Sequence, residues 1–275
     1  MPDSADDDCA HVFPHSDEDA ARAERIPDTP QTRAPAYRLA FTDRDFLLRE
    51  ELRPVRLQLE LLKSQMMLDE AGIESTVVMF GGARIPAPEH AAQARTPTLA
   101  ALSVYYEEAR LFAQEMTHRS MAAGGRDFVI ATGGGPGVME AGNLGAYEAG
   151  GRSIGLGIVL PHEQAPNLYV TPELSFNFHY FAIRKMHFLM RARAIAVFPG
   201  GFGTLDELCE TLTLIQTGRM TPVPILLFGR EFWQGIVNWR ALADSGTISD
   251  CDLDLFRYVE TAAEAVAIID GWPKS

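Results

Sequence analysis

The chain has 275 residues, of which 47% are hydrophobic, enough for the core of one α/β domain with extensions. Its formal charge is −13, from 24 basic and 37 acidic residues. Nucleic acids and anionic membranes attract basic surfaces, so this balance argues against both as partners. Three cysteines without CxxC spacing, no apolar run of about 18 residues and no apolar leader predict a reducing, cytoplasmic setting without disulfides or a membrane span.

The first part of the chain lacks the periodic apolar pattern of a folded domain. Residues 1–36 are rich in Asp, Glu, Pro and Ala, and we expect this acidic N-terminus to be disordered. Residues 37–73 predict a helical extension that Thr42 or Asp43 caps and Gly72 ends. Its apolar side chains form two faces, which favours packing on the domain and on a second element or subunit. A helix buried wholly within its own chain is the alternative.

From residue 74 to residue 275, continuous apolar strands alternate with helices. The strands are expected at 75–82, 127–135, 153–160, 194–201, 222–229 and, shorter, 255–259. The helices are expected at 97–123, 136–150, 179–192, 203–217, 230–243 and 261–272. Strands that are apolar throughout and separated by helices form a parallel sheet covered on both faces. The pattern predicts a doubly wound, Rossmann-like α/β domain that binds ligands at the carboxyl ends of its strands.

Three glycine-rich turns follow predicted strands: FGGAR at 80–84, TGGGPGVME at 132–140 and FPGGFGT at 198–204. All three would lie at one edge of the sheet, where helix N-termini offer free N–H groups and partial positive charge to a phosphate. The dinucleotide fingerprint is incomplete because Val138 stands where its last glycine belongs, and no Gly-Lys pair of a P-loop occurs. A nucleoside monophosphate or sugar phosphate is therefore favoured, and tight connections without a ligand are the alternative.

Four segments together resemble the LOG ("lonely guy") family of cytokinin-activating nucleoside 5′-monophosphate phosphoribohydrolases, many of whose relatives are labelled lysine decarboxylases. They are GGARIP, GGGPGVMEAGNLGA, RKMHFLM and PGGFGTLDE, the last matching PGGxGTxxE, and the resemblance spans about residues 75–270. The second segment is closer to the longer bacterial branch than to the plant-type form. The resemblance implies hydrolysis of the N-glycosidic bond of AMP or a cytokinin riboside monophosphate by a homodimer or larger assembly. No cofactor is expected, and no metal, because the histidines lack HExxH spacing.

The resemblance gives Arg184 and Glu207 catalytic roles. A fixed carboxylate near C1′ stabilises an oxocarbenium-like ribose and orients or deprotonates water, and a nearby arginine keeps that carboxylate ionised. We expect Asp206 to be a helix N-terminal charge instead. The predicted substrate contacts are Gly82, Arg84, Gly133, Gly134, Gly135, Met139, Glu140, Lys185, Pro199, Gly200, Gly201, Gly203 and Thr204.

Plainer interpretations stand beside these roles. Arg184 and Lys185 could form a solvated helix face, Glu140 could be a helix N-terminal acid, and Arg84 could cap the sheet edge. A pyridoxal phosphate decarboxylase needs a Schiff-base lysine, and only Lys185 of the three lysines is suitably placed. A non-catalytic carrier of a nucleotide or molybdenum cofactor would keep the phosphate turns but has little need for both catalytic residues.

Overall fold

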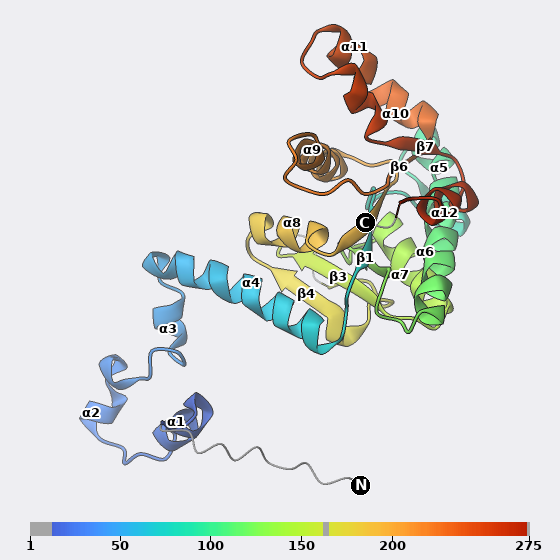
Figure 1. Ribbon diagram of the computed structural model, residues 1–275. Helices are drawn as coiled ribbons and strands as arrows, with labels where there is room; N and C mark the ends of the chain where they lie inside the picture. The colour runs from blue at the N-terminus through green and yellow to red at the C-terminus, as the bar shows by residue number, and fades with distance from the viewer. Residues whose placement is uncertain (1–12, 162–164, 274–275) are drawn as a thin grey trace. The chain divides into compact units, whose positions relative to one another are not determined.

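The computed structural model describes residues 13–161 and 165–273 (Figure 1). The chain divides into two compact units, Met1–Leu59 and Glu60–Ser275, and the division falls inside helix α4 (Arg53–Glu70). The second unit thus starts before the domain predicted from residue 74, and Ser64 and Leu68 of α4 are buried. Within the described ranges, no helix is long and apolar enough to cross a membrane.

The first unit contains short helices, the first two of them within residues 1–36, where we expected disorder, and the others at or after the start of the predicted helical extension. They are α1 (Ser16–Ala23), α2 (Pro30–Arg33), η1 (Pro35–Tyr37), α3 (Arg44–Leu47) and η2 (Glu50–Leu52), and none of them contains a buried residue. Local capping supports them: the Asp43 carboxylate accepts hydrogen bonds from the first N–H groups of α3. The rest of the stretch predicted to be disordered, residues 1–12, lies outside the described residues.

The second unit is built on a seven-stranded parallel sheet in the order β4-β3-β2-β1-β5-β6-β7. The strands are β1 (Thr76–Phe80), β2 (Val129–Thr132), β3 (Ser153–Ile158), β4 (Ser175–Phe178), β5 (Ala192–Val197), β6 (Ile225–Phe228) and β7 (Arg257–Val259). The doubly wound α/β fold is confirmed. Sequence analysis missed β4, because this edge strand alternates exposed and buried residues and lacks the continuous apolar run of its neighbours.

Helices cover both faces of the sheet. The helices of this unit after α4 are α5 (Pro97–Ala101), α6 (Val104–Ala122), α7 (Val138–Glu148), α8 (Phe181–Leu189), α9 (Phe202–Gln216), α10 (Arg230–Ile236), α11 (Trp239–Asp244) and α12 (Ala262–Asp270), with 3₁₀ turns η3 (Pro88–Gln93), η4 (Pro172–Leu174) and η5 (Asp250–Asp254). Helices α6, α7 and α12 lie on one face, and α8 and α9 on the other (Figure 1). From β1 the chain adds strands toward β4, and from β5 it adds strands toward β7. Because crossovers between parallel strands are right-handed, the connecting helices of these two halves lie on opposite faces.

That reversal places the switch point of the topology between β1 and β5. The pairing continues beyond the strands: Phe198 N–H donates to the Phe80 carbonyl at 2.8 Å, and Gly82 N–H donates to the Pro199 carbonyl at 2.9 Å. The first and third glycine turns are therefore bonded to each other, although more than a hundred residues separate them. In open α/β sheets this crevice is where ligands bind.

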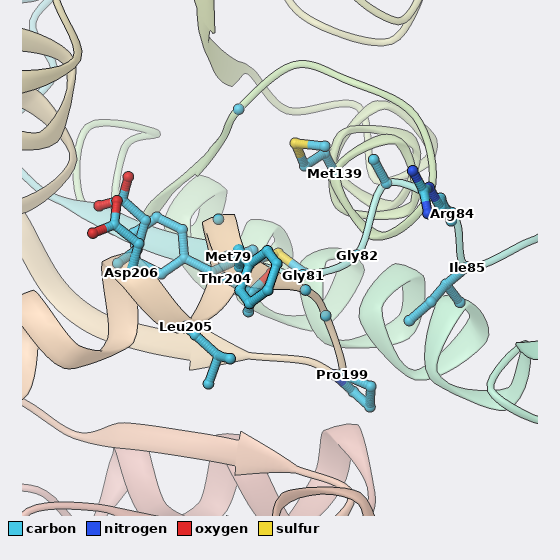
Figure 2. Close-up of a pocket in the computed structure, with 18 of the residues that line it drawn as sticks. Met79, Gly81, Gly82, Arg84, Ile85, Met139, Pro199, Thr204, Leu205 and Asp206 are labelled. Atoms are coloured by element: carbon cyan, nitrogen blue, oxygen red, sulfur yellow. The ribbon is translucent and has the colours of Figure 1, made fainter. Parts of the chain in front are cut away.

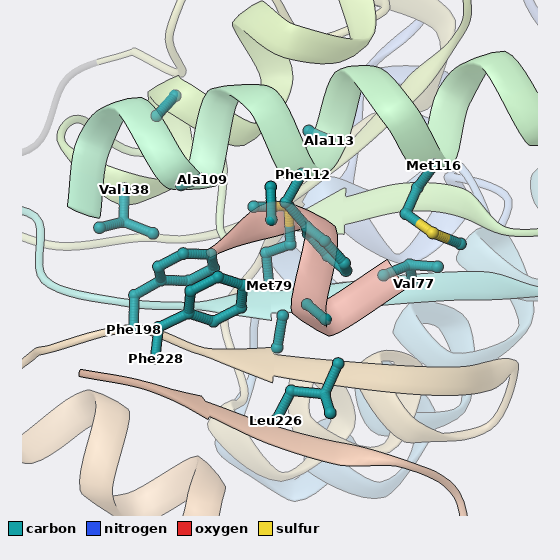
Figure 3. Packing of buried hydrophobic residues seen from close by; sticks show 14 of the residues in the cluster. Val77, Met79, Ala109, Phe112, Ala113, Met116, Val138, Phe198, Leu226 and Phe228 are labelled. Atoms are coloured by element: carbon teal, nitrogen blue, oxygen red, sulfur yellow. The ribbon is translucent and has the colours of Figure 1, made fainter. Parts of the chain in front are cut away.

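A buried aromatic cluster holds the β5 end of this crevice in place. Phe198 stacks on Phe228 with ring centroids 4.1 Å apart, and Phe112 from α6 meets Phe228 edge-on at 5.8 Å (Figure 3). All three side chains are fully buried, and each such burial contributes roughly 2 kcal/mol. The strand end just before Pro199 is thus rigid, which is what a positioned loop requires.

Candidate active site

A cavity of about 830 Å³ opens at the carboxyl edge of the sheet, a volume typical of small-molecule sites (Figure 2). Its wall comes from the turns after β1 and β5, from α8 and α9, and from α10. Most of the predicted site residues line it: Gly82, Arg84, Gly133, Met139, Arg184, Pro199, Gly200, Gly201, Gly203, Thr204 and Glu207. In the view of Figure 2, Arg84 and Asp206 lie at opposite sides of the cavity.

Three predicted contacts on the turn after β2 are absent from the cavity wall as the structure describes it: Gly134, Gly135 and Glu140. The carbonyls of both glycines accept hydrogen bonds from the Asn167 amide at 3.1 and 3.0 Å. The Glu140 carboxylate accepts a hydrogen bond from the Tyr106 hydroxyl at 3.0 Å. These groups are engaged within the protein, so substrate contact by them has no support in this geometry.

The turn after β2 packs directly on the turn after β1. Gly137 has φ of +70°, and a Cβ at this position would lie 2.4 Å from the Gly82 carbonyl oxygen. Only glycine combines this conformation with so close an approach. The N–H of Val138 also donates to Gly82 at 3.3 Å, so all three glycine turns predicted from the sequence meet at one edge.

The turn after β5 leads straight into helix α9. Thr204 is buried in the first turn of the helix, and a Cβ on Gly200 would lie 2.1 Å from its hydroxyl oxygen. Glycine is therefore required at this position for the loop to fold back over Thr204. The first N–H groups of α9 have no acceptor within the helix and carry its partial positive charge into the cavity wall.

Arg184 reaches the cavity from α8 and is held at several points. Its Nε donates to the Leu156 carbonyl of β3 at 2.7 Å, and its guanidinium lies 5.1 Å from the centre of the Phe188 ring. A Cβ added at Gly133 would lie 2.7 Å from Arg184 Nη2. The guanidinium therefore lies against the backbone of the turn after β2. A solvated helix face does not describe this side chain.

Glu207 lies one turn beyond Thr204 on α9 and is 6% exposed. Its Oε2 makes no hydrogen bond to any of the described residues. Burial raises the pKa of this carboxyl to about 7, against the lowering effects of Lys185 and Arg184. Arg184 lowers this pKa, in the direction we expected, but the effect of desolvation is larger.

Lys185 points to the carboxylates of α9 and not into the cavity. Its ammonium lies 2.9 Å from Asp206 and 2.7 Å from Glu210. Burial alone would lower its pKa, but the bonds to Glu210 and Asp206 outweigh burial and raise it. The predicted phosphate contact is not what this geometry shows, and a protonated, ion-paired amine is unsuited to Schiff-base formation. Asp206, expected to be only a helix N-terminal charge, is a partner in this ion pair.

Sequence analysis missed the apolar part of the cavity wall. It consists of Met79, Phe80, Ala83, Ile85, Leu99, Leu102, Ile158, Leu160, Phe181, Phe188, Phe202, Leu205, Phe232 and Ile236. Phe181 and Phe188 could have been found, because they lie three residues before and four after Arg184 on the same helix face. Nothing local marks Phe232 and Ile236, which α10 brings to the site from the far side of β6.

The fold and this cavity define an α/β protein with a candidate small-molecule site at the switch point of its sheet. Residues 139–269 match the family described as "Possible lysine decarboxylase", and this stretch includes Arg184 and Glu207. This match covers slightly less than half of the chain, and it contains the segments RKMHFLM and PGGFGTLDE that resemble the LOG family.

Two solved structures are among those similar to the chain. The protein TM1055 is 22% identical, with 72% of this chain and 99% of that chain covered and a TM-score of 0.47. The Moco carrier protein from Chlamydomonas reinhardtii is 18% identical, with 72% and 96% covered and a TM-score of 0.44. No curated protein gives a significant match to the chain.

Proposed function

We propose that the protein hydrolyses the N-glycosidic bond of a nucleoside 5′-monophosphate, either AMP or a cytokinin riboside monophosphate. The products are the free base and ribose 5-phosphate. One observation carries the proposal: the buried carboxyl of Glu207 lies in the wall of a cavity, within two helical turns of an N-terminus suited to a phosphate.

The spacing along α9 suits this substrate. Glu207 follows the N-cap Gly201 by six residues, about 9 Å along the helix axis. A phosphate on the N–H groups of Gly201 and Gly203 would therefore place the ribose beside the carboxyl. The apolar side chains of the wall leave room for the base.

The chemistry needs a carboxylate and a fixed cation. Water adds to C1′ while the C1′–N bond breaks. The electron pair of that bond leaves with the base, and the base takes up a proton. The Glu207 carboxylate stabilises the positive charge that develops on the ribose and accepts a proton from the water. The Arg184 guanidinium, held against the turns, binds the anionic end of the substrate or balances Glu207.

A panel of nucleoside monophosphates tests this proposal, with free base and ribose 5-phosphate measured by chromatography. We expect release from AMP or its N6-substituted analogues and none from the corresponding nucleosides, which lack the phosphate. Tight nucleotide binding without base release over hours would instead indicate a non-catalytic carrier. Carbon dioxide released from lysine, with pyridoxal phosphate absorbance, would indicate a decarboxylase.

We further propose that the protein acts in the cytoplasm as a homodimer or larger assembly, without nucleic acid or membrane partners. The acidic charge supports the last two points. Exposed apolar side chains on α4 and α8, among them Leu62, Met66 and Met186, support self-association. Light scattering behind a sizing column tests it, and a monomer at micromolar concentration would contradict it.

A further inference from the structure

At the cavity wall, α9 carries three carboxylates, Asp206, Glu207 and Glu210, and two of them form ion pairs with one ammonium ion. Asp206 and Glu207 each lie on the same side of the helix as Glu210, which follows them by four and three residues. Lys185 comes from α8, next in sequence to Arg184, and bonds to Asp206 and Glu210. The ion pairs therefore join the two helices that carry the proposed catalytic residues.

The Lys185 side chain is more buried than the side chains of its two ion-pair partners. The Lys185 side chain is 15% exposed, whereas Asp206 and Glu210 are 58% and 35% exposed. A charge withdrawn from solvent acts on its neighbours with less screening than a charge at the surface. The charge of Lys185 therefore acts also on Glu207, which is itself buried and directly follows Asp206 in the chain.

We infer that Lys185 is a positioning residue of the proposed hydrolase site, whose ammonium, fixed by Asp206 and Glu210, maintains the ionised form of Glu207. This inference rests on the proposed function, because the ionised carboxyl is the form that stabilises a cationic ribose. Lys185 itself contacts neither the cavity nor, in this role, the substrate.

Among the described residues, the charged groups with the largest effect on Glu207 come from these two helices. Lys185 and Arg184 lower its pKa, while burial, Glu210 and Asp206 raise it. Without the ammonium, three carboxylates would face one guanidinium, and Glu207 would take up a proton at a higher pH than it now does. A simple clamp between α8 and α9 would have a different consequence: its loss would loosen the structure without moving the titration of Glu207.

Replacing Lys185 separates these two roles when the pH profile of base release is measured. In Lys185→Met we expect the acidic limb of kcat to move upward by about one pH unit, so that turnover falls about tenfold at pH 6.5 and recovers toward the native value above pH 9. Lys185→Arg should restore the native profile. A uniform loss at every pH, or an unchanged profile, would overturn the inference.

Lys63→Met is the matched control. It removes the same charge from an exposed position of α4 and should leave the profile unchanged. An equal shift in this variant would show that net charge, and not the position of Lys185, sets the titration.

Infrared titration of the protein alone gives a readout that needs no turnover. The carboxyl band of Glu207 is identified by its loss in Glu207→Gln, and its midpoint should rise in Lys185→Met. Asp206→Asn should move the midpoint to lower pH, because it removes a carboxylate and leaves the ammonium. If these midpoints move but no nucleotide releases base, the proposed hydrolase fails and the Lys185–Glu207 coupling stands. If neither midpoint moves, the coupling is wrong.

Discussion

The turns after β2 and β5 look alike in sequence but differ in how their polar groups are bonded. Each is a glycine-rich segment that leads into a helix with a glutamate near its start, Glu140 on α7 and Glu207 on α9. Glu140 accepts a hydrogen bond from the Tyr106 hydroxyl, and Asn167 bonds the glycine carbonyls of its turn. Glu207 is more deeply buried and leaves one oxygen without a hydrogen bond among the described residues.

The difference favours a structural role for the turn after β2 and a catalytic role for the segment after β5. Buried polar groups are normally bonded, and a group that is buried without a bond lowers stability. The turn after β2 satisfies its polar groups within the protein, which suits a scaffold. The turn after β5 retains a costly carboxyl in a cavity wall, and such groups cluster at functional sites. The predictions below would break or sharpen this contrast.

Removal of the Glu207 carboxyl should have the largest effect. In Glu207→Ala we expect base release to fall about 10²–10³-fold, because the charge that stabilises the ribose cation is lost. Binding of AMP should change less than about threefold, because the phosphate turn is untouched. Steady-state kinetics and calorimetry measure the two quantities.

Glu140→Gln is the control on the other turn. Its partner Tyr106 can still donate to the amide oxygen, so we expect turnover within about threefold of the native value. A loss in Glu140→Gln as large as in Glu207→Ala would remove the distinction between the two turns.

The free energy of unfolding should show how strongly burial of the ionised Glu207 carboxylate destabilises the folded protein. The folded protein raises its pKa from 4.5 to about 7, so the folded state binds the proton more tightly than the unfolded state. The stability that this group contributes is fully present below pH 4.5 and is lost as the pH rises through 7. Glu207→Gln should therefore match the native protein near pH 4 and exceed it by about 3 kcal/mol at pH 8.

Urea unfolding at both pH values measures this difference. Glu140→Gln should show no such gain at pH 8, because its carboxylate is already bonded. An equal free energy of unfolding for native protein and Glu207→Gln at pH 8 would contradict the raised pKa.

Two neighbouring glycines of the turn after β5 should respond differently to alanine. A Cβ on Gly200 would collide with Thr204, whereas a Cβ on Gly201 meets open space. We expect Gly200→Ala to lower the free energy of unfolding by about 2 kcal/mol and Gly201→Ala to change it by less than about 0.5 kcal/mol. Similar losses in both variants would show that the turn depends on glycine flexibility and not on this packing.

Much of the fold followed from patterns that are local in the chain. Continuous apolar runs and the glycine turns that end them located six of the seven strands, and the edge strand β4 escaped because half of its residues face solvent. Helices α5 and α6 replace one predicted helix, as do α10 and α11, since short breaks leave little trace in the apolar period. The motifs also gave the resemblance to the LOG family and both proposed catalytic residues.

The sequence by itself determined which residue types follow each strand, because strand, turn and helix patterns act over a few residues. Only the tertiary structure decided that the β1 and β5 turns bond to each other, since this depends on the order of strands in the sheet. It also decided that burial outweighs Arg184 at Glu207 and that Lys185 bonds to Asp206 and Glu210. Desolvation and charge pairing depend on distances between segments far apart in the chain, and those distances exist only once the core has packed.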